Sequence, residues 1–396
     1  MKKFKRVFLL VMDSLGIGHD IDAKKFGDDN PNTFKHIDEF VNGLNATTLE
    51  QLGFGDFDDY VKIKKINHKN SYTARLNELS NGKDTMTGHW EFMGVNTTKA
   101  FKTFTDTGFP KELIDEITKQ TGYKIIGNKS ASGTEIIKEL GEEHMKTKAL
   151  IVYTSADSVL QIAAHEEVVS IDELYKICSI VREITMKEEW KVGRIIARPF
   201  IGHNKDDFKR TARRHDYALS PSTKTHLEYL KDAGLEVISV GKINDIFNTC
   251  GITSAYKSTS NHHGMEITTD LASKDFTGLC FVNLVDFDME YGHRRNVLGY
   301  ASCIEEFDKD VKVLMSKLNE DDLLILTADH GNDPTAKGSD HTREQVPVVL
   351  YSKSLEDGKY LGVYHTFATI GATICDNFNV EFGNDLVGKS ILNELK

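Results

Sequence analysis

The 396-residue sequence lacks several features that mark common classes of protein. Its five cysteines are an odd number without CxxC spacing, which argues against a disulfide framework. No apolar run reaches the length of a transmembrane helix, and there are no internal repeats or low-complexity tracts. With a net charge of −11, the chain also lacks the basic excess of a general nucleic-acid binder. We therefore expect a globular, cytoplasmic protein without nucleic-acid or membrane partners, and a monomer.

The N-terminus looks at first like a secretion signal, because residues 1–6 are rich in lysine and residues 7–12 are apolar. However, the apolar run has only six residues, ends in Asp13 and has no small-residue cleavage site. This segment is better explained as a buried first strand.

Short apolar, β-branched runs alternate with amphipathic helical patterns along the chain. Ser170 and Glu173 have the spacing of a capping box and open a helix with a continuous apolar face. A second helix is predicted over 299–318. The expected strands are 6–12, 123–127, 148–154, 193–200, 235–241, 278–286, 322–328 and 346–352. This alternation predicts an α/β fold with a largely parallel sheet.

Charge is unevenly distributed along the chain. Residues 187–214 hold nine Lys and Arg against four acidic residues, which makes this segment either an anion site or a solvated surface run. The acidic and histidine motifs described next all lie outside residues 100–220. We therefore predict a catalytic core domain formed by residues 1–100 and 220–396, with residues 101–219 inserted as a smaller domain.

Aspartate and histidine residues recur where predicted strands end. Asp13 follows the first strand, and Asp329 and His330 follow a later one. Ligand sites in open α/β sheets form beyond the carboxyl ends of strands. Each residue alone could be structural, because an Asp after a strand often makes only a turn and a lone His is seldom a ligand. The recurrence of Asp and His at several strand ends favours a metal site over chance.

Two more segments complete this pattern. Residues 286–293 offer His293 and either Asp286 or Asp288, a choice that the spacing leaves open, and a polar loop offers His341. Nitrogen and oxygen ligands without cysteine suit Mn²⁺, Zn²⁺ or Mg²⁺ and disfavour iron–sulfur or structural zinc sites. Six ligands exceed the needs of one catalytic zinc but divide well between two ions about 3.5–4 Å apart.

A nucleophile for such a centre can come from residues 81–91, a polar, glycine-bounded turn that leads into a helical pattern. A hydroxyl there would sit near a helix N-terminus, and metal coordination would lower its pKa. Thr85 and Thr87 both qualify. The competing explanation is a threonine that only caps the helix.

Four segments together resemble bacterial phosphopentomutases, a family within the alkaline phosphatase superfamily. The resemblance runs nearly end to end, and its second and fourth segments are the most specific. The segments are residues 13–18 (DSLGIG), 83–91 (KDTMTGHWE), 329–333 (DHGND) and 340–344 (DHTRE). The resemblance implies an alkaline-phosphatase-like core and an inserted α/β cap domain.

The resemblance also implies an isomerase that interconverts ribose 1-phosphate and ribose 5-phosphate, and the deoxyribose pair. It implies two Mn²⁺ ions, replaceable by Mg²⁺, Zn²⁺ or Co²⁺, and a sugar 1,6- or 1,5-bisphosphate as activator. By this likeness Thr85 is phosphorylated and touches both ions. One ion is held by Asp13, Asp329 and His330, and the other by Asp288, His293 and His341. The implied substrate contacts are Ser155, Asp157, Arg194, Arg210 and Lys242.

Some alternatives stay open. An insertion at residues 203–207 leaves Arg213 and Arg214 as competitors of Arg210. A phosphatase or phosphodiesterase on the same metal core would pass the phosphoryl group to water instead of sugar. A cofactor-independent phosphoglycerate mutase is expected to have serine where this chain has Thr85. A metal-stabilised binding module without turnover would tolerate loss of Thr85.

Overall fold

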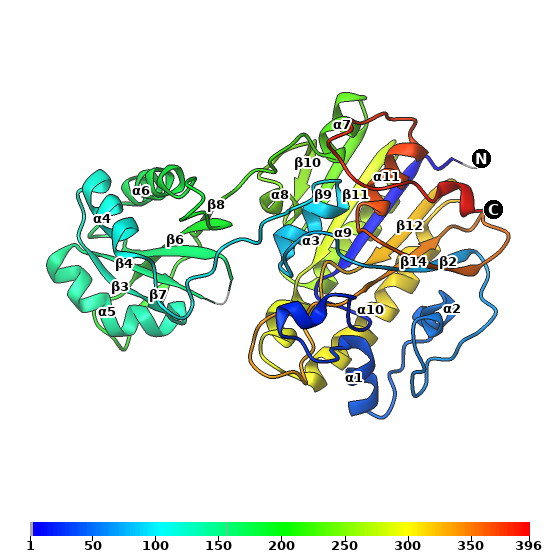
Figure 1. Cartoon of the computed structure of the whole chain (residues 1–396), viewed down its shortest axis with the longest axis horizontal. Coiled ribbons are helices and arrows are strands. Elements are labelled where there is room, and N and C mark those ends of the chain that lie inside the picture. Colours follow the sequence, from blue (N-terminus) through cyan, green and yellow to red (C-terminus); the bar gives the residue numbers. More distant parts are fainter. Residues whose placement is uncertain (1–2, 156) are drawn as a thin grey trace. The chain divides into compact units, whose positions relative to one another are not determined.

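The computed structural model describes residues 3–155 and 157–396. The chain divides into two compact units, which are described separately (Figure 1). The larger unit, the core unit, comprises Met1–Lys99 and Ser220–Lys396, and the smaller unit is Ala100–Leu219. The core unit is thus built from both ends of the chain, with the second unit formed by the middle of the sequence.

The core unit is organised around an eight-stranded sheet with the order β10-β9-β11-β1-β12-β13-β2-β14. Neighbouring strands run parallel except at β13, which is antiparallel to both β12 and β2. The strands are β1 Arg6–Met12, β2 Ser71–Leu76, β9 Glu236–Val240, β10 Ser254–Tyr256, β11 Gly278–Leu284, β12 Asp322–Thr327, β13 Val346–Tyr351 and β14 Lys359–Tyr364. The apolar N-terminal run is therefore a buried central strand, as expected, because parallel strands covered on both faces are almost wholly apolar.

The register of three central strands decides where the polar motifs meet. Met12 of β1 is paired with Leu284 of β11, and Val11 is paired with Thr327 of β12. All three strands are parallel, so their carboxyl ends lie at the same edge of the sheet. The segments after residues 12, 284 and 327 therefore leave the sheet side by side, which is the usual place for a ligand site in such sheets.

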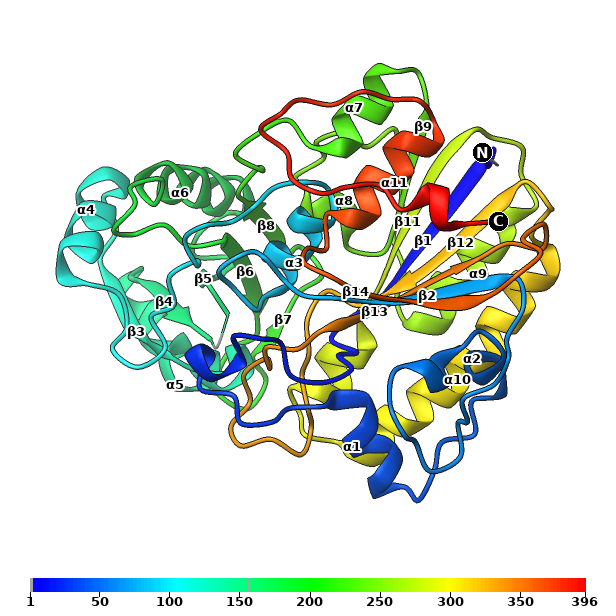
Figure 2. The ribbon, with the colours of Figure 1, turned by 45° about the vertical axis from the view of Figure 1, so that its right-hand side comes forward.

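Helices cover both faces of the core sheet (Figures 1 and 2). One layer holds α3 Thr85–Phe92, α7 His226–Asp232, α8 Ile243–Ile246 and α11 Thr369–Asn377. The other holds α1 Thr33–Phe40, α2 Thr47–Gln51, α9 Asn261–Ala272 and α10 Val297–Lys317. Short 3-10 turns lie at Ala23–Phe26, Phe54–Asp56 and Leu392–Glu394, and a π-helical turn at Phe287–Gly292. Within the described residues, no helix is long and apolar enough to cross a bilayer.

The smaller unit has a sheet of its own with the order β3-β4-β5-β6-β7, and β8 also pairs with β6. Its strands are β3 Ile125–Ser130, β4 Leu150–Thr154, β5 Val159–His165, β6 Arg194–Ile201, β7 Lys209–Arg210 and β8 His215–Ala218. Its helices are α4 Lys111–Thr121, α5 Gly133–Thr147 and α6 Ile171–Ile184. The apolar faces of α4 and α6 pack in one buried cluster with Leu160 and Ile162 of β5, so this unit has its own core.

All eight predicted strands exist, and their ends differ from the predicted ones by at most three residues. The helix that begins after Ser170 is present, and the Ser170 side chain accepts a hydrogen bond from Glu173 N. The helix predicted over 299–318 spans Val297–Lys317. Cys178, Cys280 and Cys303 are buried free thiols, as their apolar settings indicate. Six further strands, β2, β5, β7, β8, β10 and β14, are not predicted by the pattern.

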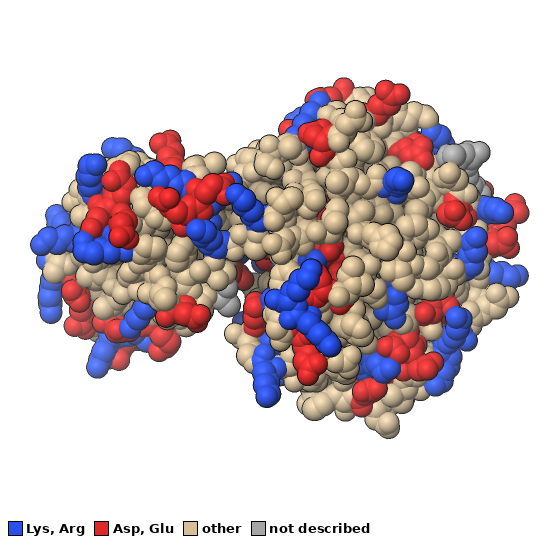
Figure 3. Space-filling view, viewed as in Figure 1, with Lys and Arg blue, Asp and Glu red and all other residues tan. Residues whose placement is uncertain are grey.

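Part of the basic segment is neutralised locally. Arg213 pairs with Glu166, and Arg214 pairs with Asp216, which also lies near Arg194. On the face shown in Figure 3, Lys and Arg mix with Asp and Glu instead of forming one basic field. Part of the segment is therefore an ordinary charged surface.

Candidate metal centre

The first carboxylate at the strand edge is that of Asp13, which directly follows β1 and is almost fully buried. Its Oδ2 accepts a hydrogen bond from the Asn283 side chain at 2.9 Å. Its Oδ1 has no hydrogen-bond partner among the described residues and lies 3.5 Å from Nε2 of His330. A buried carboxylate oxygen without a hydrogen bond destabilises the folded state, and a bound cation would offset this destabilisation.

Asp329 and His330 follow β12 and are also buried. Asp329 Oδ1 accepts a hydrogen bond from the Ser14 backbone N–H at 3.0 Å, so the loops after β1 and β12 brace each other. Asp329 Oδ2 lies 3.4 Å from His330 Nε2. Asp13, Asp329 and His330, which we name the Asp13 set, place one potential ligand atom each within 4.8 Å of one another.

Asp288, His293 and His341, which we name the Asp288 set, form a second cluster. Asp288 lies in the π-helical turn after β11, and its Oδ2 is 3.0 Å from His293 Nε2. Its Oδ1 is 3.5 Å from His341 Nε2. Asp288, His330 and His341 also fall within 4.8 Å of one another, so His330 lies between the two sets. Asp286 instead accepts a hydrogen bond from the Asn261 backbone, away from this cluster.

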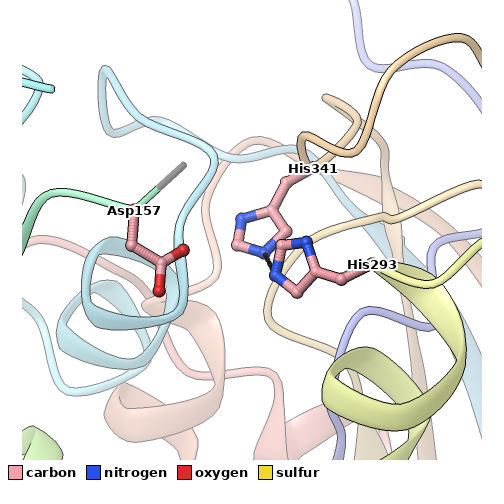
Figure 4. A group of neighbouring side chains, drawn as sticks. All are labelled: Asp157, His293 and His341. Carbon is pink, nitrogen blue, oxygen red and sulfur yellow. Dashed lines mark hydrogen bonds between the residues drawn. The ribbon is translucent and has the colours of Figure 1, made fainter. Parts of the chain in front are cut away.

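The three imidazoles are oriented in the same way. Nδ1 of His293, His341 and His330 lies 2.7, 2.8 and 3.1 Å from the carbonyl oxygens of Ser339, Lys83 and Gly331, respectively. A carbonyl oxygen only accepts hydrogen bonds, so each Nδ1 donates, and each Nε2 is the ring atom turned toward the carboxylates. In Figure 4 the rings of His293 and His341 meet through their Nε2 atoms, which are 3.1 Å apart. This is the arrangement of metal-ligating histidines.

The pKa values of the carboxylates reflect this crowding. Burial, followed by the charges of Asp329 and Asp288, raises the pKa of Asp13 well above its usual range. Burial also disfavours the charged form of Asp288, but His341 and His293 outweigh it and hold its pKa well below the usual range. Three carboxylates that share one buried region repel each other, and a divalent cation relieves the repulsion.

The donor set therefore fits metal ions. Three carboxylates and three imidazoles without cysteine suit Mn²⁺, Zn²⁺ or a similar divalent ion. The orphaned Asp13 oxygen and the convergent Nε2 atoms are what a ligand shell requires.

The two candidate nucleophiles have different surroundings. Asp84 is the N-cap of α3, and its carboxylate accepts hydrogen bonds from the Thr87 backbone N–H and from the buried Thr87 hydroxyl at 2.6 Å. Thr85 is the first residue of the helix, and its Oγ1 lies 3.2 Å from His330 Nε2. Asp84 therefore takes the capping role, Thr87 is occupied with it, and the Thr85 hydroxyl faces the Asp13 set.

Some side chains that contact the ligand residues are not predicted from the sequence. His89 lies one helical turn after Thr85, with Nδ1 2.8 Å from the Thr85 carbonyl and 3.2 Å from Asp329 Oδ2. Asn283 holds Asp13, and Asn332 donates to Asp288 at 2.7 Å. The sequence contains a signal for Asn283, because it is the one amide side chain in the apolar run that forms β11 and so marks a polar contact. The i, i+4 spacing of Thr85 and His89 was a second such signal.

The predicted substrate contacts fall in both units. In the smaller unit, Arg194 Nη2 donates to Asp157 Oδ2 at 3.1 Å, and Ser155 lies two residues before Asp157. Arg210 is exposed on the short strand β7, paired in register with Phe200. Lys242 is the N-cap of α8 in the core unit, and its charge favours the ionised form of Asp13.

Comparison with known proteins agrees with this picture. The sequence model of the Metalloenzyme superfamily matches residues 5–382. A protein named phosphopentomutase from Agathobacter rectalis is 58% identical over 395 residues, and one from Clostridium botulinum is 56% identical over 395 residues. Each alignment covers 100% of both chains. A solved phosphoglycerate mutase from Leishmania mexicana aligns over 98% of this chain and 97% of its own, with 14% identity and a TM-score of 0.47, too distant to support an argument.

The α/β core with a mostly parallel sheet between helices, which the sequence predicts, is confirmed (Figures 1 and 2). The full-length matches leave no large part of the chain without a counterpart in the relatives. The chain therefore belongs to the Metalloenzyme superfamily and, within it, to the phosphopentomutase family.

Proposed function

We propose that this protein is a phosphopentomutase, an isomerase that interconverts ribose 1-phosphate and ribose 5-phosphate, and the corresponding deoxyribose phosphates. The observation that carries the proposal is the Thr85 hydroxyl at the N-terminus of α3, 3.2 Å from His330, in a chain 58% identical to a phosphopentomutase. A hydroxyl at a helix N-terminus beside metal ligands is suited to hold a phosphoryl group.

In the proposed cycle, phospho-Thr85 passes its phosphoryl group to the free hydroxyl of the bound pentose monophosphate. The bond between phosphorus and Thr85 Oγ1 breaks, a bond to the sugar oxygen forms, and the proton of the sugar hydroxyl passes to Thr85 Oγ1. The product is a pentose 1,5-bisphosphate. Its original phosphate is then transferred to Thr85 Oγ1, whose proton passes to the released sugar oxygen, and the isomer leaves. Phosphate is conserved throughout.

Two ions, one at the Asp13 set and one at the Asp288 set, would supply positive charge to the transferring phosphoryl group and lower the pKa of the Thr85 hydroxyl. Mn²⁺ is the proposed ion, with Mg²⁺, Zn²⁺ or Co²⁺ as substitutes. A sugar 1,6- or 1,5-bisphosphate would serve as activator by phosphorylating Thr85. Buried carboxylates and neutral imidazoles are the residues that would hold these ions.

The phosphate that is not being transferred needs its own contacts. We assign these to Ser155, Asp157, Arg194, Arg210 and Lys242. Arginine offers bidentate contacts to phosphate, and Asp157 already orients the Arg194 fork. Burial of the phosphothreonine away from water would favour transfer to sugar over hydrolysis. A monomeric, cytoplasmic enzyme belongs to the same proposal, since its free thiols would stay reduced in that compartment.

The test is to follow ribose 1-phosphate by phosphorus NMR with the purified protein, Mn²⁺ and a trace of glucose 1,6-bisphosphate. We expect ribose 5-phosphate to accumulate with little free phosphate. Dominant release of free phosphate would instead assign the protein as a phosphatase on the same metal core. A protein without turnover would leave the ribose 1-phosphate signal unchanged.

A further inference from the structure

Arg295 joins three segments that surround the Asp288 set. Its Nε donates to the Gly338 carbonyl at 2.6 Å, and its Nη2 donates to the Asp340 carbonyl at 2.9 Å. Its Nη1 donates to the Gly292 carbonyl at 2.9 Å and also to the Asn332 side-chain oxygen. One guanidinium therefore connects the turn after β11 with two parts of the loop between β12 and β13, at Asn332 and at residues 338–340.

Each of these bonds leads to a ligand of the Asp288 set. Asn332 accepts from Arg295 through Oδ1 and donates through Nδ2 to Asp288 Oδ1 at 2.7 Å. Arg295 thus fixes which end of the Asn332 amide faces Asp288.

The two carbonyls at residues 338 and 340 flank Ser339, whose own carbonyl lies 2.7 Å from His293 Nδ1 and orients that ring. Asp340 also directly precedes His341 in the chain. By holding this loop, Arg295 acts on His293 and His341 together.

The Asp13 set has other supports. Asp13 is held by Asn283, and Asp329 is held by the Ser14 N–H and lies beside His89. None of these contacts involves Arg295. The two sets also differ in exposure, because the His293 side chain is 27% exposed whereas the His330 side chain is fully buried. The Asp288 set is the more open one and depends on loops that need to be held.

The backbone of Arg295 is adapted to this role. Its φ of 53° lies in the left-handed region, which a non-glycine residue keeps where the surrounding structure holds it there. Its backbone N–H donates to the Gly292 carbonyl at 3.1 Å. The neighbouring Arg294 is exposed and forms an ion pair with Glu290 on the surface.

We propose that Arg295 is a positioning residue that assembles the Asp288 set. Its loss weakens the binding of the metal ion at the Asp288 set and leaves the binding of the ion at the Asp13 set unchanged. This inference rests on the proposed two-metal function. The stronger metal binding comes from the hydrogen bonds of the Arg295 guanidinium and not from its charge. A positive charge beside a cation site would by itself weaken cation binding.

The experiment is a calorimetric titration of chelator-treated full-length protein with Mn²⁺, comparing the wild type with R295K, R295A and the matched control R294A. We expect two ions for the wild type and R294A. For R295K and R295A, we expect one ion with the wild-type affinity and a second bound at least about 10-fold more weakly, the range seen for outer-shell contacts to metal ligands. Lysine keeps the charge but cannot make the four bonds.

Two ions bound by R295K with wild-type affinity would overturn the inference. A wild-type protein that binds fewer than two ions would overturn the two-metal function itself, so the two failures are distinguishable. If the Arg295 variants do not fold, as judged by circular dichroism, N332A breaks the same link to Asp288 from the other side. Unchanged binding of both ions by N332A would then contradict the proposal.

Discussion

Oγ1 of Thr85 lies 3.2 Å from Nε2 of His330, and the two residues are 245 positions apart in the chain. Thr85 begins helix α3, and His330 follows strand β12. The close approach requires that α3 rest directly on the loop after β12.

Replacement of Thr85 should remove the phosphoryl carrier. We expect T85A to lose isomerase activity to the background, because no other hydroxyl occupies this place, while metal binding persists through the remaining ligands. The measurement is the NMR assay of ribose 1-phosphate conversion, together with intact mass after incubation with glucose 1,6-bisphosphate.

The matched control is T87A. The Thr87 hydroxyl is bonded to Asp84, so its loss should cost about 1 kcal/mol in the free energy of unfolding and leave the phosphorylated mass unchanged. A T85A protein that still gains 80 Da, roughly one phosphoryl group, would disprove the assignment.

The contact between α3 and the loop after β12 has no spare room. A Cβ on Gly88 would lie 2.1 Å from the Asp329 carbonyl oxygen, which is backbone and cannot step aside. We expect G88A to lose about 1–3 kcal/mol of stability and most of its activity, because the helix must move off the loop. Urea unfolding and the isomerase assay measure the two effects.

G264A serves as the comparison, since Gly264 also lies in a helix and the nearest atom to its Cβ would be the side-chain tip of Leu284 at 3.2 Å, followed by Ser258 Cβ at 3.6 Å. Alanine is the better helix former, so the change in stability should stay within about 1 kcal/mol. Equal behaviour of the two variants would argue against a tight contact at Gly88.

Removal of divalent ions should destabilise the core unit. Without an ion, burial and the neighbouring charges of Asp329 and Asp288 disfavour the ionised form of Asp13. At a metal concentration 1,000 times the dissociation constant, binding stabilises the native state by about 4 kcal/mol. We therefore expect a chelator to lower the melting temperature by several degrees, and added Mn²⁺ to restore it, in differential scanning fluorimetry.

D13N is the control for this effect. It removes the charge of a carboxyl whose pKa is raised well above its usual range. The chelator-treated variant should therefore melt at or above the chelator-treated wild type, and Mn²⁺ should raise its melting temperature less. A D13N protein with the full response to Mn²⁺ would show that the ion binds elsewhere.

Glu344 makes the stability of the core unit dependent on pH. Its carboxylate accepts bonds from Gly18 N, Thr33 N, Thr33 Oγ1 and Thr342 Oγ1, but burial raises its pKa from 4.5 to about 7. The folded state therefore binds this proton more tightly than the unfolded state. The stabilising contribution is complete below pH 4.5 and is lost as the pH rises through about 7.

Between pH 5 and 8, we expect the free energy of unfolding of the metal-free wild-type protein to fall relative to that of E344Q, by at most about 3 kcal/mol. Glutamine keeps the shape and does not titrate, so the difference between the two proteins isolates Glu344 from the other ionisable groups. The measurement is urea unfolding in a chelating buffer at several pH values. Parallel stability curves for the two proteins would contradict the raised pKa.

The pattern of apolar runs predicts the central strands well and the peripheral ones poorly. Strands β1, β11 and β12 are buried on both faces, so their composition alone identifies them. Strand β14 is half exposed at the sheet edge and is interrupted by a bulge, which removes any periodic signal. Strand β5 contains Gln161 and consecutive alanines, which have low strand propensity.

The sequence by itself determined which residue types end the central strands, and therefore that carboxylates and imidazoles would collect at one edge of a parallel sheet. Local composition is enough for this, because burial of a strand requires an apolar run and a polar residue marks its end. The spacing left the choices between Asp286 and Asp288 and between Thr85 and Thr87 open, and the family resemblance favoured Asp288 and Thr85. The tertiary structure puts Asp288, inside the π-helical turn, beside His293, whereas Asp286 precedes the turn as its N-cap and bonds to Asn261. The contact between His89 and Asn283 spans 194 positions, and Arg295 reaches Asn332 and the carbonyls of residues 338 and 340 over 37 to 45 positions. A local pattern can mark such a residue as unusual but does not encode which partner it meets.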